Sequence, residues 1–73
     1  MTVHQVRVVE AFIKSEPAIS GSFVSVGDAL YSYDLKLAHR RAGRVIIDVD
    51  LSAEAFSVTT ARHIIAMREV LGA

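Results

Sequence analysis

The segment FSVTTARH, residues 56–63, holds the residue types best suited to chemistry in this chain. A hydroxyl such as Ser57 beside an imidazole such as His63 is the pairing of nucleophilic catalysis, where histidine accepts the hydroxyl proton. Such catalysis also needs a group that orients the histidine and donors for a developing oxyanion. Nothing in the sequence fixes Asp48 or Asp50 near His63, and no glycine-rich elbow exposes a nucleophile. We therefore expect no catalytic residues and no enzymatic activity.

The same segment is typical of the start of a helix. Its hydroxyl residues directly precede apolar residues at helical spacing, and a side-chain oxygen there accepts from a backbone N–H that the helix leaves unpaired. The candidate cap residues are Ser57, Thr59 and Thr60. Either Ser57 or Thr59 is expected to be the cap, and its loss should cost about 1 kcal/mol. Phe56 is expected to act as a hydrophobic staple or to anchor the loop in the core.

Two groups of basic residues are candidates for binding anions. The free amides of the last helix, with the side chains that follow them, suit a phosphate or carboxylate. The run HRRAGR, residues 39–44, places three arginines around a turn that is able to follow a phosphate backbone. The candidate anion or nucleic-acid contacts are Arg40, Arg41, Arg44, Arg62 and His63. The other interpretation is that the arginines solubilise the turn and pair with Asp48, Asp50 or Glu54.

We expect no metal ion and no cofactor. The three histidines, His4, His39 and His63, show no zinc-binding spacing, and the chain contains no cysteine. Asp48 and Asp50 share one face of an expected strand, but nothing completes a coordination shell around them.

The N-terminal segment favours a helix from about Val3 to Lys14. Thr2 and Gln5 have the spacing of a capping box, and Pro17 ends whatever precedes it. The apolar residues at three- and four-residue steps are Val6, Val9, Phe12 and Ile13. The competing interpretation is a strand, because VHQVRVV is rich in β-branched residues.

The middle of the chain predicts a three-stranded antiparallel meander. FVSV is followed by a Gly27-Asp28 turn, ALYSYDLKLAHRR forms one continuous strand, and Gly43 turns the chain into RVIIDVDL. The residues predicted to face the core are Tyr31, Tyr33, Leu35, Leu37, Val45, Ile47, Val49 and Leu51. Those predicted to face water include Ser32, Asp34, Lys36, Arg40, Ile46, Asp48 and Asp50. His39 is placed on the inward face, at the edge of the core.

The last segment is predicted to form a helix that covers the meander. Its apolar stripe consists of Ala61, Ile64, Ile65, Met67 and Leu71. Gly72 stands where a helix stop is expected. The sequence therefore predicts one α+β domain, residues 1–73, with an N-terminal helix, three strands and a C-terminal helix on one sheet face.

Size and composition limit the function. The chain has 73 residues, 52% of them hydrophobic, with eight basic and eight acidic residues. A general nucleic-acid binder carries a basic excess, which is missing here. No apolar run reaches the roughly 18 residues that span a membrane, and the first residues lack the order of a secretory signal. We expect a soluble intracellular protein without membrane contact.

The segments LYSYDLKLAHRRAGRVII and FSVTTARHI resemble a family of small uncharacterised proteins frequent in phage and prophage genomes. The family shows a Ser-Tyr pair, a strand ending in Ala, a glycine turn, a further strand and Tyr-Ser-x-Thr-Thr-Ser-x-His. The matching positions are Ser32, Tyr33, Ala38, Gly43, Ser57, Thr59, Thr60 and His63. Phe56 and Ala61 replace the family's tyrosine and last serine. The resemblance implies a phage-type protein acting in the cytoplasm of a bacterial host.

We therefore predict a small non-enzymatic protein that acts by protein–protein interaction, as a homo-oligomer, with a bacterial host protein, or both. A short chain without disulfides has little core, so oligomerisation is a common reinforcement. An exposed strand edge in FVSV or RVIIDVD would make a symmetric dimer easy. The alternative is a nucleic-acid-binding module that uses the basic turn and the start of the last helix.

Overall fold

The described chain, residues 2–49 and 56–72, forms two helices and one antiparallel sheet in the computed structural model. The elements are α1 (Val3–Ile13), β1 (Ala18–Ser20), β2 (Phe23–Val26), β3 (Ala29–Ser32), β4 (Leu35–Arg41), β5 (Arg44–Ile47) and α2 (Val58–Leu71). The five strands follow one another across the sheet in chain order, β1-β2-β3-β4-β5. This α+β meander agrees with the predicted class and contradicts the predicted three strands.

The predicted first helix is confirmed as α1. Thr2 caps it by accepting from the Gln5 backbone N–H at 3.2 Å, while the Gln5 side chain accepts from the Thr2 N–H at 3.0 Å. This capping box satisfies donors that an open helix end leaves unpaired. The buried residues of α1 are Val8, Val9 and Phe12. Ile13, which was predicted in the stripe, is exposed because α1 ends there.

Two features of the chain explain the two additional strands. The segment predicted as one strand from residue 29 to 41 is broken by a turn at Tyr33 and Asp34. Tyr33 takes a left-handed φ of 55°, and its N–H donates to the Ser22 carbonyl at 2.8 Å. The second feature is β1, three residues in a stretch whose proline, glycine and serines indicated only a turn. Its residues pair with β2, so tertiary pairing overrides the local signal.

The predicted alternation of faces also fails in β3 and β4. Leu30 pairs with Ala38 while Tyr31 pairs with Lys36, so a bulge sets Leu37 and Ala38 side by side in the core. Tyr33 is 59% exposed in its turn rather than buried. Ser32, which was predicted to face water, is fully buried. Leu35 is 38% exposed. Asp50 and Leu51 lie outside the described residues.

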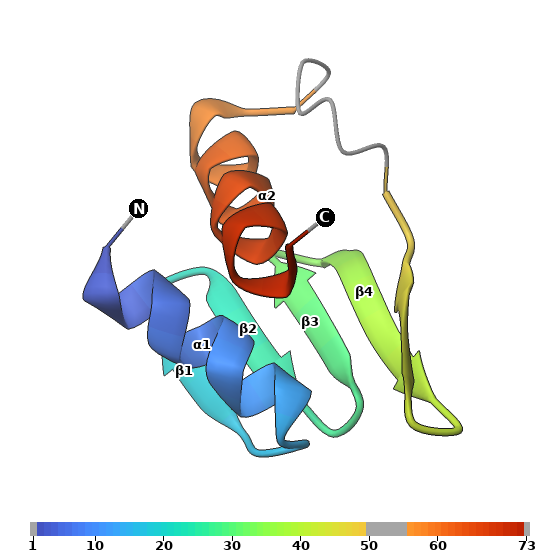
Figure 1. The fold of residues 1–73 in the computed structure, drawn as a ribbon. Helices are drawn as coiled ribbons and strands as arrows, with labels where there is room; N and C mark the ends of the chain where they lie inside the picture. The colour runs from blue at the N-terminus through green and yellow to red at the C-terminus, as the bar shows by residue number, and fades with distance from the viewer. Residues whose placement is uncertain (1, 50–55, 73) are drawn as a thin grey trace.

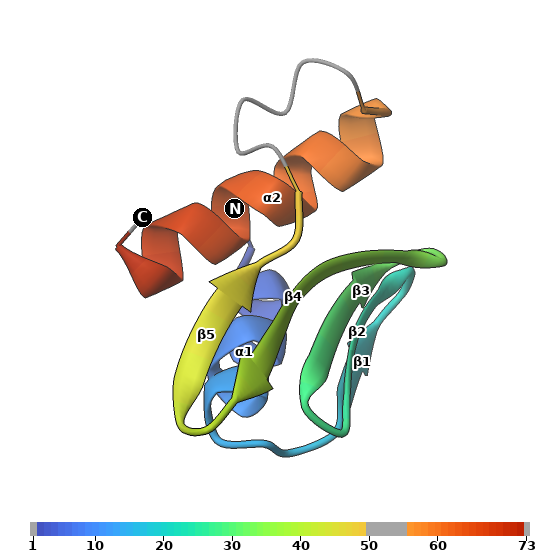
Figure 2. The ribbon, with the colours of Figure 1, turned by 90° about the vertical axis from the view of Figure 1, so that its right-hand side faces the viewer.

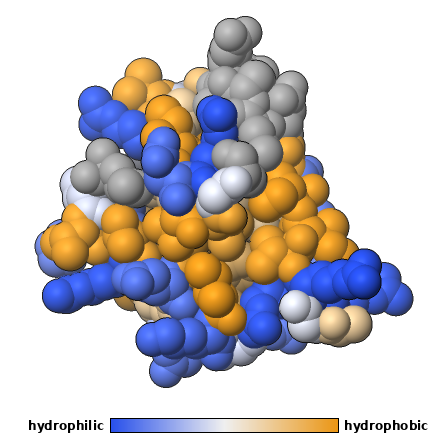
Figure 3. Space-filling model, in the orientation of Figure 1, coloured by the Kyte–Doolittle hydropathy of each residue, from blue (hydrophilic) through white to orange (hydrophobic). Residues whose placement is uncertain are grey.

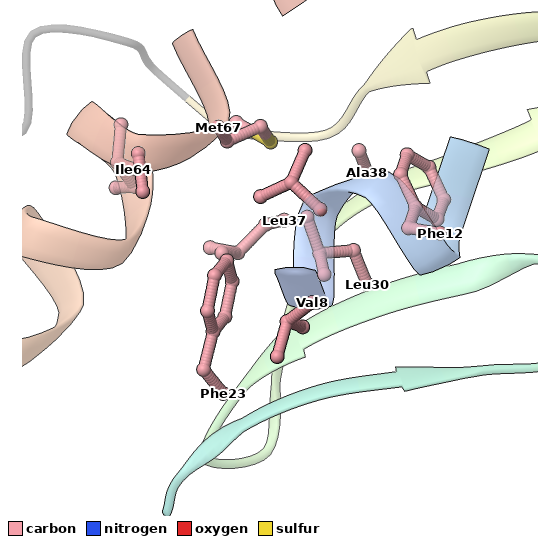
Figure 4. Close-up of a cluster of buried hydrophobic side chains, with 10 residues drawn as sticks. Val8, Phe12, Phe23, Leu30, Leu37, Ala38, Ile64 and Met67 are labelled. Carbon is pink, nitrogen blue, oxygen red and sulfur yellow. The ribbon is translucent and has the colours of Figure 1, made fainter. Parts of the chain in front are cut away.

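The sheet curls around α1, as Figures 1 and 2 show together. α1 contacts β1, β2 and β3, and α2 lies against α1 across one end of the sheet. α2 packs mainly against α1 and meets the sheet at the end of β3, so α1 provides most of the cover that was predicted from the last helix alone. A left-handed Gly72 ends α2. Residues from both helices and three strands meet in one core, which Figure 4 shows. The labelled core residues are Val8, Phe12, Phe23, Leu30, Leu37, Ala38, Ile64 and Met67.

The other, convex face of the sheet carries no helix among the described elements. Directly paired residues in an antiparallel sheet lie on the same face, so the register identifies this face. The convex residues are Ile19, Val24, Tyr31 and Lys36 in one row, Val26, Ala29, His39 and Ile46 in the next, and Arg41 with Arg44 at the tip. His39 therefore points away from the core, contrary to the prediction.

Candidate functional site

Only one of the three predicted hydroxyl residues caps α2. Ser57 is the N-cap, in an extended conformation, and its side chain accepts from the Thr60 backbone N–H at 3.2 Å. Thr59 is exposed, whereas the Thr60 side chain turns into the core. Phe56 packs against the same core. The three predicted cap residues are therefore one cap, one exposed hydroxyl and one buried hydroxyl.

The buried hydroxyl belongs to a cluster of three polar side chains. Thr60 and His63 are one turn apart and so share a face of α2. That face meets the end of β3, where Ser32 Oγ lies 3.0 Å from Thr60 Oγ1 and 2.7 Å from His63 Nδ1. All three residues are buried. The three hydrogen-bonding groups satisfy one another, which is the condition for burying them without a large penalty.

A stacked ring completes the cluster. The Phe23 ring lies 4.3 Å from the His63 ring and nearly parallel to it, with an interplanar angle of 6°. Phe23 is paired with Ser32 across β2 and β3, so one sheet row holds both partners of the histidine. Burial lowers the pKa of His63 below its ordinary value of 6.5, because the charged imidazolium loses its hydration. The site therefore favours a neutral imidazole.

The cluster contains a serine–histidine pair, but its surroundings favour a structural role. Ser32 is fully buried, so no substrate carbonyl reaches its oxygen in this conformation. Among residues 2–49 and 56–72, no carboxylate is hydrogen-bonded to His63 to orient it. Ser57, which was considered and rejected as a nucleophile beside His63, caps α2. Ser32, Thr60 and His63 together tie α2 to the end of β3.

The basic residues that were predicted to bind anions do not lie on one surface. Arg40 is half-buried and donates to Ser15 Oγ in the loop after α1. Arg41 and Arg44 lie opposite each other at the β4–β5 tip, which Figures 1 and 2 place at the end of the molecule opposite to the start of α2. Arg62 is exposed on α2, and His63 is buried. The basic residues of the β4–β5 tip and those at the start of α2 therefore cannot form a single binding site.

The acidic residues that were predicted to pair with these arginines do not do so in the described part of the chain. Asp48 accepts a hydrogen bond at 2.8 Å from His39 Nδ1 and forms no ion pair with the tip arginines. Asp50 and Glu54 lie outside the described residues. No cluster of three metal-binding side chains occurs within residues 2–49 and 56–72. In the same part of the chain, neither helix has the length and apolar character required to cross a membrane.

The sequence predicted an exposed strand edge in FVSV or RVIIDVD, but FVSV forms β2, which is paired on both sides, and the apolar surface at β1 was not predicted. Ile19 on β1 is 73% exposed and Val26 on β2 is 52% exposed, both on the convex face. A shallow hollow of about 310 Å³ lies there, lined by Pro17, Ala18, Ile19, Val24, Ser25 and Val26. The sequence signal for this surface was weak, because β1 lies in a stretch rich in residues that favour turns.

No protein-family model, curated protein or solved structure matches this chain. Ser32, Thr60 and His63, which meet in the core, are among the positions used for the expected resemblance to phage proteins.

Proposed function

We propose that this chain is a small, non-enzymatic phage-type protein that acts by protein–protein interaction, with a second copy of itself as its first partner. A bacterial host protein is its further partner, in the cytoplasm of the host cell. The observation that carries the proposal is the uncovered sheet. Both helices lie on the concave side, so the convex face and the outer edge of β5 have no cover among the described residues.

The composition of the uncovered surface supports protein binding. Ile19, Val26 and Ile46 are exposed on the convex face, and exposed apolar side chains of this kind are available to a protein partner. β5 ends the sheet, and an edge strand with exposed β-branched residues favours pairing with another chain. Figure 3, which looks onto the side of the molecule that carries the helices, shows hydrophobic side chains across the middle and on the right of the view.

The size of the chain supports self-association in particular. A domain of 73 residues buries little surface, and the chain has no cysteine with which to form a disulfide. Covering apolar surface by a second copy is a direct way to add stability. Burial of Ser32 supports the non-enzymatic part of the proposal, since the serine of the buried serine–histidine pair is closed to substrate.

Sedimentation velocity over the micromolar concentration range tests the proposal. We expect a species of twice the monomer mass whose fraction rises with concentration. A monomer at every concentration, stable to heat on its own, would contradict self-association. The matched control is a variant with Ile65→Ser, which removes an exposed apolar side chain on α2 rather than on the sheet and should leave the dimer fraction unchanged.

A nucleic-acid-binding module is the second candidate function. The observation that favours it is the pair of arginines at the β4–β5 tip, Arg41 and Arg44, which make no ion pair within the described chain. Phosphate contacts of this kind give affinity that falls steeply with salt. A mobility shift at low salt that is lost in an Arg41→Ala, Arg44→Ala variant would support this candidate. No shift at low salt with DNA or RNA would exclude it.

A further inference from the structure

The outer edge of β5 presents a defined set of backbone groups. The Asp48 N–H donates to the Leu37 carbonyl at 2.9 Å, while Ile47 is paired with Ala38. In an antiparallel ladder this places the backbone N–H and C=O of Arg44, Ile46 and Asp48 toward β4. The N–H and C=O groups of Val45 and Ile47 therefore point away from the sheet.

The side chains of β5 are exposed on both faces of the sheet. Val45 lies on the concave side and is 37% exposed, and Ile46 lies on the convex side and is 40% exposed. In Figure 1 no element lies beyond β5, the yellow segment at the right-hand edge of the sheet. An edge that is apolar on both faces and has free backbone groups is a template for another strand.

The sequence of this edge is complementary to itself when it is read antiparallel. Residues 44–48 read Arg-Val-Ile-Ile-Asp. About a two-fold axis at Ile46, Val45 of one copy lies opposite Ile47 of the other, and Arg44 lies opposite Asp48. Because the axis is perpendicular to the sheet, paired residues stay on the same face, and both charged pairs lie on the convex side.

The charges of the single chain support this arrangement. Arg44 is directly opposite Arg41, and like charges in that position are destabilising. Neither guanidinium has an ion-pair partner in the described chain. Asp48 uses only its Oδ2 atom, for His39, which leaves its Oδ1 atom for a second donor. An aspartate supplied by a second copy offsets the repulsion that Arg44 experiences within one copy.

From these observations we infer that two copies of the chain pair antiparallel through β5, centred on Ile46, with Arg44 of each copy bound to Asp48 of the other. Val45 and Ile47 exchange backbone hydrogen bonds with Ile47 and Val45 of the second copy. This inference deepens the proposed function and rests on it, because it names the surface and register of the self-association.

Neighbouring registers fit less well. An axis at Val45 would place Arg44 opposite Ile46 and would require Gly43, a turn residue with a left-handed φ of 77°, to pair as a strand residue. An axis at Ile47 would place Asp48 opposite Ile46. Only the axis at Ile46 satisfies the outward backbone groups and both charges together. It also joins the two convex faces on one side of a continuous sheet.

Reversing the charges of residues 44 and 48 tests the register of the β5–β5 pairing. Arg44→Asp should raise the dimer dissociation constant measured by sedimentation about tenfold or more, because two attractive pairs become repulsive. Asp48→Arg should do the same. In an equal mixture of these two variants both pairs are again opposite in charge, so a heterodimer should form although neither variant dimerises well alone. The double variant should recover the wild-type constant to within about threefold.

Two of the variants show whether a loss of the dimer could instead come from a loss of folding. Arg44→Asp places a carboxylate opposite Arg41, so the single chain should be at least as stable as the wild type. Val45→Pro removes an N–H that points away from β4, and it should abolish the dimer while the far-ultraviolet circular dichroism stays unchanged.

The outcomes separate the inference from the proposed function. A wild-type dimer that neither single charge reversal weakens would overturn the β5 register and leave self-association standing. Weakening that neither the mixture nor the double variant reverses would also overturn the register. A wild-type protein that is monomeric throughout would overturn both.

Discussion

At the scale of single residues, the imidazole of His63 is the buried group whose charge state is most sensitive to folding. It is buried, stacked on Phe23 and hydrogen-bonded to Ser32, and its pKa is lowered by the loss of hydration. The unfolded chain therefore takes up this proton at a higher pH than the folded chain does. The contribution of His63 to stability is complete above its ordinary pKa of 6.5 and is lost as the pH falls below that value.

We therefore predict that the free energy of unfolding decreases as the pH is lowered from about 8 to about 5, and that His63→Gln reduces this decrease. Glutamine can still hydrogen-bond Ser32 but does not titrate. Urea unfolding at matched protein concentration measures the difference. Replacing His4, which is exposed on α1, with glutamine is the control and should leave the wild-type slope. Equal slopes for His63→Gln and the wild type would contradict the account of this residue.

The polar cluster shows what the sequence predicts about a site and what it does not. Ser57 is recognisable as a cap from its place before an apolar stripe, because a cap depends on local sequence. Ser32 is not recognisable as buried, because its partners His63 and Thr60 lie about thirty residues away. Alternation alone assigned Ser32 to water, and the turn at Tyr33 removed the basis for that alternation.

At the scale of elements, the β4–β5 hairpin has a turn type that suits its strands but an alanine at a position where alanine is strained. Arg41 is paired with Arg44 across a two-residue turn, and both turn residues have positive φ, 52° for Ala42 and 77° for Gly43. Such a turn matches the twist of the strands and favours Asn-Gly. Alanine in this conformation is strained, because its Cβ lies close to the backbone carbonyl.

Ala42→Asn is therefore expected to raise the free energy of unfolding by roughly 0.5–1 kcal/mol, since asparagine tolerates this conformation better. Gly43→Ala is the matched opposite change. Apart from Gly43 itself and its two neighbours in the chain, no residue has an atom within 4 Å of the position that the Cβ would take. Any loss of stability there therefore comes from the backbone conformation. Thermal unfolding of both variants measures the two effects. A less stable Ala42→Asn protein would contradict this description of the turn.

The helices and the strands differed in how far the sequence predicted them. α1 and α2 carry their own caps and a clear stop, so their bounds follow closely from local residues. β1 has only three residues and exists because β2 lies beside it. The bulge that buries both Leu37 and Ala38 likewise depends on the pairing with β3. Short strands and bulges are set by their partners, so one strand's own sequence does not determine them.

At the scale of the whole molecule, the fold is one-sided. Two helices fill the concave face of a five-stranded sheet and leave its convex face and the β5 edge uncovered among the described residues. Pairing through β5 would cover the edge and would leave both convex faces, with Ile19 and Val26, on one side of the dimer. We propose that joined face as the surface for the host partner of the proposed function.

Amide hydrogen exchange in β5, followed by nuclear magnetic resonance, tests the pairing most directly. The Ile46 N–H points toward β4 and is an internal reference that should be protected at every protein concentration. The amides of Val45 and Ile47 point outward, so we predict that they become protected as the concentration rises into the range where dimers form. Rapid exchange of both amides at high concentration, while Ile46 stays protected, would contradict the account.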